Sequence, residues 1–271
     1  MIPVCPICSR KMTNAFSAVV LERHEAHYDY CEACGFLRVR NPHWIDEAYS
    51  SAIAISDTGL VLRNIDIAKK LTSVLFFLLG ERGQGRYLDA AGGYGLLVRL
   101  MRDYGFDFYW SDKYCENLLA RGFEYTSELG ECAAVTAVEI MEHVEDPTAF
   151  VQDAMKMAQS NTFLFTTALF EGSPPPRDWW YYSFETGQHI SLYQRRTLET
   201  IARTLGLSLV SGGGLHMFSK THVSETAFRA LAGRLSAPSS SFARRRLGTL
   251  AMQDHKQMVE RLRKMPATSD C

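Results

Sequence analysis

Short apolar runs alternate with stretches of helical periodicity along most of this chain. Apolar residues recur at helical spacing in the stretches 57–79, 96–104, 115–121, 147–157 and 195–206. Strand-like apolar runs stand between them, at residues 87–89, 106–110, 123–125, 133–138, 161–170, 207–210 and 214–218. This alternation is typical of a parallel sheet with helices on both faces. The pattern therefore predicts an α/β fold with a doubly wound sheet.

The two ends of the chain follow other patterns. Apolar and polar residues alternate in Phe16–Leu21 and His27–Tyr30, as in a small β-ribbon, and Asn41–Pro42 then interrupts the chain. From Glu225 onward the pattern is helical, with an expected break at Ser236–Ser241. We therefore expect a ribbon lobe at 1–42, a helical segment at 43–84, the sheet domain at 85–221 and a helical tail at 222–271.

Composition and charge limit the classes of protein that fit this pattern. At 271 residues, with 46% hydrophobic and 22% charged residues, the chain can form one full α/β domain and a small appendage. A formal net charge of −1 gives no overall attraction to nucleic acid or to an acidic membrane. The first twenty residues lack the apolar core of a signal peptide, and the longest apolar run, Val74–Leu79, is too short to cross a bilayer. We expect a cytoplasmic protein without a membrane partner, of open oligomeric state.

Four of the seven cysteines form two CxxC pairs, Cys5 with Cys8 and Cys31 with Cys34, separated by 22 residues. This spacing is typical of a four-thiolate zinc site, because each tight turn presents two sulfur atoms to one tetrahedral ion. Two disulfides are the alternative, although thiols stay reduced in the cytosol. Since four cysteines leave no ligand position open, we expect the zinc to be structural and the ribbon to need it for folding.

A glycine-rich turn follows the first strand of the central domain. Strand 87–89 ends in the carboxylate of Asp89, and the segment GGYG at 92–95 follows, where a chain can turn tightly and approach a ligand closely. Asp112 ends the next strand, a position from which a carboxylate accepts both ribose hydroxyls. A plain packing turn is the alternative. A nicotinamide or flavin fingerprint would place a third glycine at Val98, so another kind of nucleotide is favoured.

The segment 89–95 resembles the first motif of the class I S-adenosylmethionine-dependent methyltransferases, in which an acidic residue precedes three alternating glycines. Ala91 stands at the first glycine of that pattern, and the other two are retained. The resemblance covers residues 86–218 and implies a Rossmann-like sheet with an antiparallel final strand and S-adenosyl-L-methionine as cofactor. It also implies that helix 57–79 covers the cofactor, with simple packing on the sheet as the alternative. The residues thereby assigned to cofactor binding are Asp89, Ala91, Gly93, Gly95, Asp112 and Lys113.

A second segment that matches this superfamily begins with the strand-like run 133–138. Ala133–Pro147 ends in acidic residues and a histidine, as does the loop after the fourth strand in these methyltransferases. The resemblance implies that Glu139, Ile140 and Met141 line the cofactor pocket, and that Glu142 and His143 close its edge. A salt bridge at a helix start is the alternative for the last two. The Asn/Asp-Pro-Pro-aromatic motif of nucleic-acid amino methyltransferases does not occur here, which disfavours that acceptor class.

A proline-rich loop carries the candidates for acceptor binding. Gly172–Pro176 cannot be a helix or a central strand, so we expect this loop over the carboxyl edge of the sheet, where open α/β sheets bind ligands. His189 lies in a Gly-x-His segment typical of small-molecule methyltransferases and is expected to take a proton from an acceptor hydroxyl. A hydrogen bond to the loop backbone is its alternative. The aromatic side chains interpreted either as a packed lid or as a platform for a sugar ring are Trp179, Trp180, Tyr181 and Tyr182.

The resemblance implies methyl transfer from S-adenosylmethionine to a small-molecule acceptor, such as a sugar or a nucleotide-linked sugar, at oxygen or carbon. The catalytic candidates are His189, Glu142 and His143, and no catalytic metal is expected. A ribosomal-RNA methyltransferase that grips RNA with its ribbon is one alternative. A non-catalytic binding module on the same fold, motivated by Ala91, is the other. The basic residues Arg244–Arg246 are interpreted as a solvated helix face, with a phosphate-binding patch as the alternative.

Overall fold

The computed structural model of the chain describes residues 3–49, 53, 55–79 and 82–264. Its centre is a six-stranded sheet in the order β5-β4-β6-β7-β10-β9. The strands are β4 (Arg86–Ala90), β5 (Asp107–Ser111), β6 (Ala134–Ala137), β7 (Thr162–Thr166), β9 (Ser208–Gly212) and β10 (Leu215–Ser219). The first four are parallel, and β10 runs antiparallel to both of its neighbours, which confirms the predicted doubly wound sheet and its antiparallel strand.

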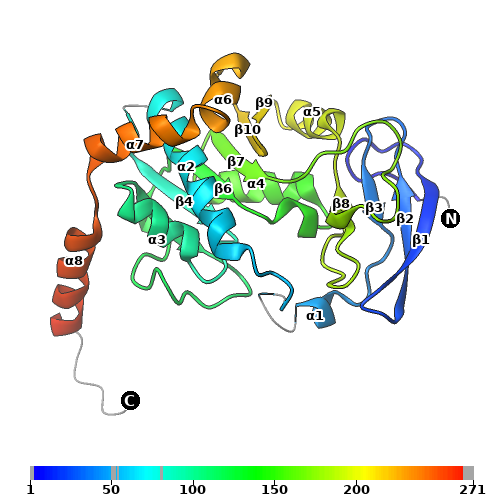
Figure 1. Cartoon of the computed structure of the whole chain (residues 1–271), viewed down its shortest axis with the longest axis horizontal. Coiled ribbons are helices and arrows are strands. Elements are labelled where there is room, and N and C mark those ends of the chain that lie inside the picture. The colour runs from blue at the N-terminus through cyan, green and yellow to red at the C-terminus, as the bar shows by residue number, and fades with distance from the viewer. Residues whose placement is uncertain (1–2, 50–52, 54, 80–81, 265–271) are drawn as a thin grey trace, which may run out of the picture.

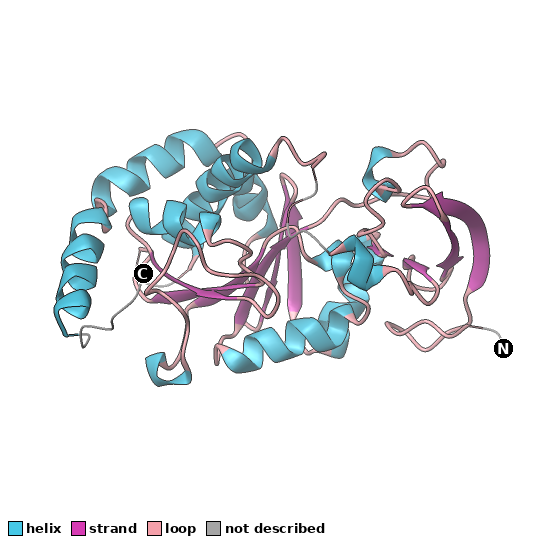
Figure 2. Cartoon of the chain, turned by 90° about the horizontal axis from the view of Figure 1, so that it is seen from below, coloured by secondary structure: helices cyan, strands magenta, loops and turns pink. Residues whose placement is uncertain are grey.

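Helices cover both faces of this sheet (Figures 1 and 2). Tyr87 and Leu88, adjacent on β4, point to opposite faces and join different hydrophobic clusters. The Tyr87 face is covered by α2 (Leu60–Leu78), α3 (Leu96–Asp103), α6 (Glu225–Ala232) and α7 (Ser236–Leu247). The Leu88 face is covered by α4 (Pro147–Met157) and α5 (Arg195–Thr204). Among the described residues, no helix is both long and apolar enough to span a membrane.

The predicted N-terminal ribbon is present, and it is joined to the main domain by a strand from far along the sequence. It contains β1 (Thr13–Val20), β2 (His24–Tyr30) and β3 (Leu37–Val39), followed by the short helix α1 (Ile45–Ala48). The two-residue strand β8 (Ser191–Leu192) pairs with β3 and completes a four-stranded antiparallel sheet, on the right of Figure 1. The cysteine end of the ribbon packs in one cluster with Val135 and Phe163 of the main sheet.

The structure corrects two of the predicted elements. No helix forms at 115–121, because the Asn117 side chain accepts from Ala120 N–H at 2.9 Å and donates to its carbonyl at 2.8 Å, which favours a turn. The next segment makes only a single bridge, between Trp110 and Glu124. The break expected at Ser236–Ser241 is instead the start of α7, because Pro238 lies in the first turn, where its missing N–H is not needed.

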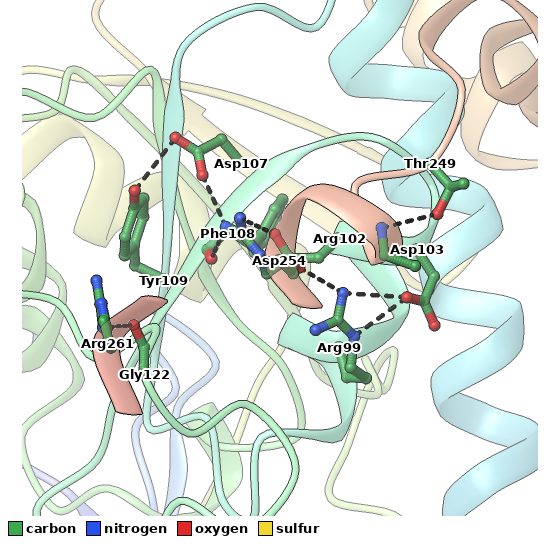
Figure 3. Close-up of polar contacts among 11 residues, drawn as sticks. Arg99, Arg102, Asp103, Asp107, Phe108, Tyr109, Gly122, Thr249, Asp254 and Arg261 are labelled. Carbon is green, nitrogen blue, oxygen red and sulfur yellow. Dashed lines mark hydrogen bonds and ion pairs between the residues drawn. The ribbon is translucent and has the colours of Figure 1, made fainter. Parts of the chain in front are cut away.

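The last described helix, α8 (Ala251–Lys264), docks on α3 through a buried ion pair (Figure 3). Asp254 receives two hydrogen bonds from Arg102, at 2.7 and 2.9 Å, and one from Arg99 at 2.7 Å. Arg102 and Asp254 are each only 3% exposed. Arg261, further along α8, donates to the Gly122 carbonyl at 2.6 Å, so the helix also holds the loop that follows Asp112.

Candidate functional site

The glycine turn joins β4 to α3 and has the geometry of a ligand-binding loop. Ala91 is left-handed, with φ of 60°, and Gly95 begins α3 with φ of 85°. The turn is closed by two hydrogen bonds, from Gly92 N–H to the Ser111 carbonyl at 3.1 Å and from Gly95 N–H to the Gly92 carbonyl at 2.9 Å. A Cβ on Gly92 would lie 2.8 Å from the Trp110 ring, so only glycine fits there.

The two predicted carboxylates lie on either side of this turn, at the carboxyl ends of neighbouring strands. Asp89 is buried and accepts from the Thr136 hydroxyl of β6 at 2.7 Å. Burial raises the pKa of Asp89 to about 7, although the Thr136 hydrogen bond lowers it. Asp112 accepts from Gly93 N–H at 2.9 Å and from two further backbone N–H groups, while the exposed Lys113 lies over the Tyr114 ring.

Sequence reasoning missed two residues that shape this turn. The indole N–H of Trp110 donates to the Gly93 carbonyl at 2.7 Å and fixes the turn against β5. Thr136 binds Asp89 across the gap between β4 and β6, where the strand order reverses and open α/β sheets bind ligands. The signal for Trp110 was an indole on a strand end beside the turn, since a partly buried indole needs an acceptor. Thr136 stands within an apolar run and gave no such signal.

The residues that follow β6 lie at the same carboxyl edge of the sheet. Glu139 is left-handed, with φ of 54°, and exchanges two hydrogen bonds with the Thr166 hydroxyl of β7, at 2.7 and 2.8 Å. Its other oxygen lies 3.2 Å from Arg63 of α2. Ile140 is half-buried, and Met141 is fully buried in the core. Glu139 is thus partly exposed, whereas Ile140 and Met141 pack inward, and the role of all three in the cofactor pocket stays a prediction.

Glu142, His143 and His189 converge on one point. One ligand atom from each lies within 4.8 Å of the other two. Burial, together with the charge of Glu139, raises the pKa of Glu142 to about 8. Burial and the neighbouring His189 ring lower the pKa of His143 to about 3, and burial also lowers the pKa of His189. The structure thus brings the three predicted catalytic candidates together. His143 also binds the Gln188 carbonyl, which lies 45 residues further along the chain, beside His189.

A network from the β8 segment holds this cluster in place. The short 3₁₀ turn η2 (Met141–His143) carries two of its residues. Tyr193 donates to the Met141 carbonyl at 2.6 Å, and Ile190 N–H donates to the Glu142 carbonyl at 2.9 Å. Ser191 donates to the Val144 carbonyl at 2.6 Å. Because the partners are buried, this turn and the His189 segment form one rigid unit.

The four aromatic residues of the proline-rich loop have different environments. Tyr182 is buried and stacks on Phe184 at 5.1 Å between the ring centroids, with Tyr28 of the ribbon at its edge. Tyr181 is buried with its ring 4.7 Å from His189. Trp179 is partly buried between them, and Trp180 is 75% exposed. Two of the four therefore pack the loop against the ribbon or the cluster, and their acceptor role stays a prediction.

The four cysteines of the ribbon form a compact sulfur cluster. Their Sγ atoms all lie within 4.8 Å of one another, and Cys5–Cys34 and Cys8–Cys31 are separated by 3.6 and 3.4 Å. These distances exclude disulfides, whose sulfurs are about 2.05 Å apart. They suit a tetrahedral ion, since zinc–sulfur bonds of about 2.3 Å place sulfurs roughly 3.8 Å apart. Thr197 of α5 donates to the Cys34 carbonyl at 2.8 Å and fixes the second turn.

Comparisons with known proteins agree with this architecture. The strand order, with acidic strand ends on either side of a glycine turn, is that of a methyltransferase-type α/β sheet. A family model described as a methyltransferase domain matches residues 63–212, which is more than half of the chain. The chain therefore belongs to this methyltransferase family. No curated protein matches it.

Several solved methyltransferase structures are similar to the chain. Magnesium protoporphyrin IX methyltransferase from Synechocystis, with SAM bound, has 15% identity and a TM-score of 0.40, over 65% of this chain and 91% of that one. A SAM-dependent methyltransferase from Thermotoga maritima has 13% identity and a TM-score of 0.42, over 66% and 97%. CalO1, a methyltransferase in calicheamicin biosynthesis, has 11% identity and a TM-score of 0.40, over 66% and 67%.

Proposed function

We propose that the chain transfers a methyl group from S-adenosylmethionine to a small polar acceptor, such as a sugar or a nucleotide-linked sugar. The observation that carries this proposal is the pair of carboxylates, Asp89 and Asp112, on either side of the glycine turn. In a member of a methyltransferase family, this arrangement suits a ligand with a cationic methionine end and a ribose. The cofactor, when bound, supplies a methyl group activated by a sulfonium.

The chain's own residues then have distinct tasks. Asp89, with Ala91, Gly93 and Gly95 of the turn, would bind the methionine end of the cofactor. Asp112 has one of about four lone pairs left for a ribose hydroxyl, because three backbone N–H groups use the others. Alignment of the acceptor with the methyl group, in a site shielded from water, would provide most of the rate enhancement.

The acceptor side of the site is assigned to the cluster of Glu142, His143 and His189. The cluster lies beyond the carboxyl end of β6, on the same edge of the sheet as the glycine turn. His189 Nδ1 lies 2.6 Å from the Tyr181 carbonyl, so this nitrogen carries the proton and Nε2 presents a lone pair. Such a lone pair can accept a proton or bind a cation. The exposed Trp180 and the half-buried Trp179 stand on the adjoining loop as candidate acceptor contacts.

The sulfur cluster of Cys5, Cys8, Cys31 and Cys34 is proposed to hold a structural zinc ion. Four sulfur ligands saturate a tetrahedral ion and leave no position for a substrate. Three of the cysteines are at most 2% exposed and pack into the core of the main domain. This burial favours a role in folding over a role in gripping RNA, which would need an exposed basic surface around the cysteines.

Calorimetric titration of the full chain with S-adenosylmethionine tests the proposal. We expect binding by the native chain, and binding about 100-fold weaker by the double variant Asp89→Asn/Asp112→Asn, because two charge-assisted contacts are lost. Asp153→Asn, an exposed carboxylate on α4, is the matched control and should bind normally. Absence of binding by the native chain would leave only the non-catalytic module, and equal binding by the double variant would remove the assigned site.

A further inference from the structure

Glu142, His143 and His189 each place one ligand atom within 4.8 Å of the other two. His143 Nδ1 lies 3.2 Å from the Gln188 carbonyl, and His189 Nδ1 lies 2.6 Å from the Tyr181 carbonyl. A carbonyl oxygen only accepts, so each Nδ1 is the protonated nitrogen and each Nε2 carries a lone pair. Two imidazoles and a carboxyl group thus share a space less than 5 Å across.

The Glu142 carboxylate is the most unusual member of this cluster. It is 0% exposed, and neither of its oxygens has a hydrogen-bond partner among the described residues. The Tyr181 and Thr167 hydroxyls bond to each other at 3.2 Å, which uses only one of their two protons, and both lie close enough to lower the pKa of Glu142. Arg63, whose charge acts on Glu142, is instead engaged by Asp57 and Glu139. A buried carboxylate without a close partner is costly, and a bound ion is one of the reasons for which native structures keep such a group.

We propose that Glu142, His143 and His189 bind a divalent first-row metal ion that holds the acceptor during methyl transfer. Two imidazoles and one carboxylate are a recurrent ligand set for such ions, and three protein ligands leave coordination positions open. The carbonyls of Gln188 and Tyr181 orient the two rings, as outer partners of metal-binding histidines do. A small contraction of the three side chains would bring their ligand atoms to bonding distance, about 2.1 Å from the ion.

This inference rests on the proposed methyl transfer and narrows its acceptor to an oxygen nucleophile. A hydroxyl that binds an open position of the ion becomes more acidic and releases its proton to water. The acceptor oxygen then forms the new bond to the methyl carbon as the carbon–sulfur bond breaks, and the electron pair of that bond stays on sulfur. The ion keeps its oxidation state. His189 is therefore a metal ligand in this scheme, in place of the proton acceptor that the sequence predicted.

Binding of Mn²⁺ alone to the full chain, followed by electron paramagnetic resonance, tests the site without any methyl transfer. Mn²⁺ favours oxygen and imidazole ligands over thiolates, so the sulfur cluster should not contribute to the measured Mn²⁺ binding. We expect one Mn²⁺ per chain in the native protein, and affinity lower by about 100-fold or more in Glu142→Gln and in His189→Ala. The matched controls are Glu145→Gln and His222→Ala, which alter exposed residues outside the cluster and should bind as the native chain does.

Two outcomes would overturn the metal site: no Mn²⁺ binding by the native chain, or native affinity in both cluster variants. Glu142→Gln keeps the size and shape of the side chain and places no charge in the buried site, so its fold should survive, and unchanged circular dichroism would verify this. Calorimetry with S-adenosylmethionine separates this inference from the proposed function. Normal cofactor binding without Mn²⁺ binding rejects the metal site alone. Selective Mn²⁺ binding without cofactor binding supports the metal site and rejects the methyl transfer.

Discussion

The sulfur cluster of the ribbon and the cluster of Glu142, His143 and His189 are two candidate metal sites of opposite design. The first has four ligands of one kind, from two tight turns, buried in a core shared with the main sheet. The second has three ligands of mixed kind, from two distant segments, at the carboxyl edge of the sheet. A saturated site can only stabilise, whereas an unsaturated site can bind a substrate. Stability and activity should therefore be separable by mutation.

Cys31→Ser should have the largest effect, and the effect should be on folding. Cys31 is fully buried, and structural zinc contributes roughly 10 kcal/mol or more to small metal-dependent folds, so we expect a loss on the order of 5 kcal/mol. Thermal unfolding and the zinc content of the purified protein measure this. Cys115→Ser, at a partly buried thiol outside the cluster, is the control and should change neither. A Cys31→Ser protein that melts at the native temperature would contradict a structural role.

His189→Ala should show the reverse behaviour. The variant loses one hydrogen bond and the contacts of the ring with Tyr181 and His143, about 1–3 kcal/mol in all, so its melting temperature should fall less than that of Cys31→Ser. Its kcat should fall about 100-fold or more, because the proposed metal site loses one of its three ligands. Steady-state kinetics with an acceptor that the native chain methylates measure this, and His222→Ala is the control. Unchanged kcat would show that the cluster takes no part in catalysis.

Asp89 should make cofactor binding depend on pH, to a smaller extent. Its pKa of about 7 in the free protein is raised by burial, and a cationic cofactor favours the ionised form. Affinity should therefore increase as pH rises through 7, by roughly tenfold between pH 6 and pH 8, as the ionised fraction grows. Titration calorimetry at several pH values measures this. Asp89→Asn is the control, because the cofactor amine titrates in the same way with both proteins. If affinity changes equally with pH in the native chain and in Asp89→Asn, Asp89 does not bind the cationic end of the cofactor.

Ala91→Gly should have the smallest effect and should be favourable. Ala91 has φ of 60°, a conformation that costs a non-glycine residue roughly 1 kcal/mol. Glycine removes this cost, but its greater conformational freedom in the unfolded chain offsets part of the gain in stability. We expect stabilisation of about 0.5 kcal/mol in denaturant unfolding. Ala158→Gly, at an ordinary φ of −84°, should instead destabilise the protein. A loss of stability in Ala91→Gly would show that the turn is not strained.

Features encoded by neighbouring residues could be predicted from the sequence. The two CxxC pairs and the glycine turn each lie within a few residues, and the structure places the four sulfurs together and the turn between Asp89 and Asp112. The alternating strands and helices gave the doubly wound sheet because apolar periodicity reports burial directly. The predicted helices also extend close to the observed bounds, as α2 shows.

Features that depend on distant contacts could not be predicted in the same way. The convergence of His189 with Glu142 is created by the β8 segment, and the burial of Arg102 by α8, which follows it by some 150 residues. Trp110 and Thr136 act through single hydrogen bonds that leave no periodic signal. The errors at 115–121 and 236–241 arose where a side chain or a proline altered the local preference of the backbone.

The two-residue strand β8 links the ribbon to the main domain, although the sequence suggests two independent units. One side of β8 pairs with β3 of the ribbon, and residues beside it clamp the turn that carries Glu142. A shortened chain that lacked the first 42 residues would leave this strand with an unpaired edge and would loosen the turn it secures. The ribbon thus supports the turn that carries Glu142 through β8, so we expect neither piece to keep its structure when cut from the other.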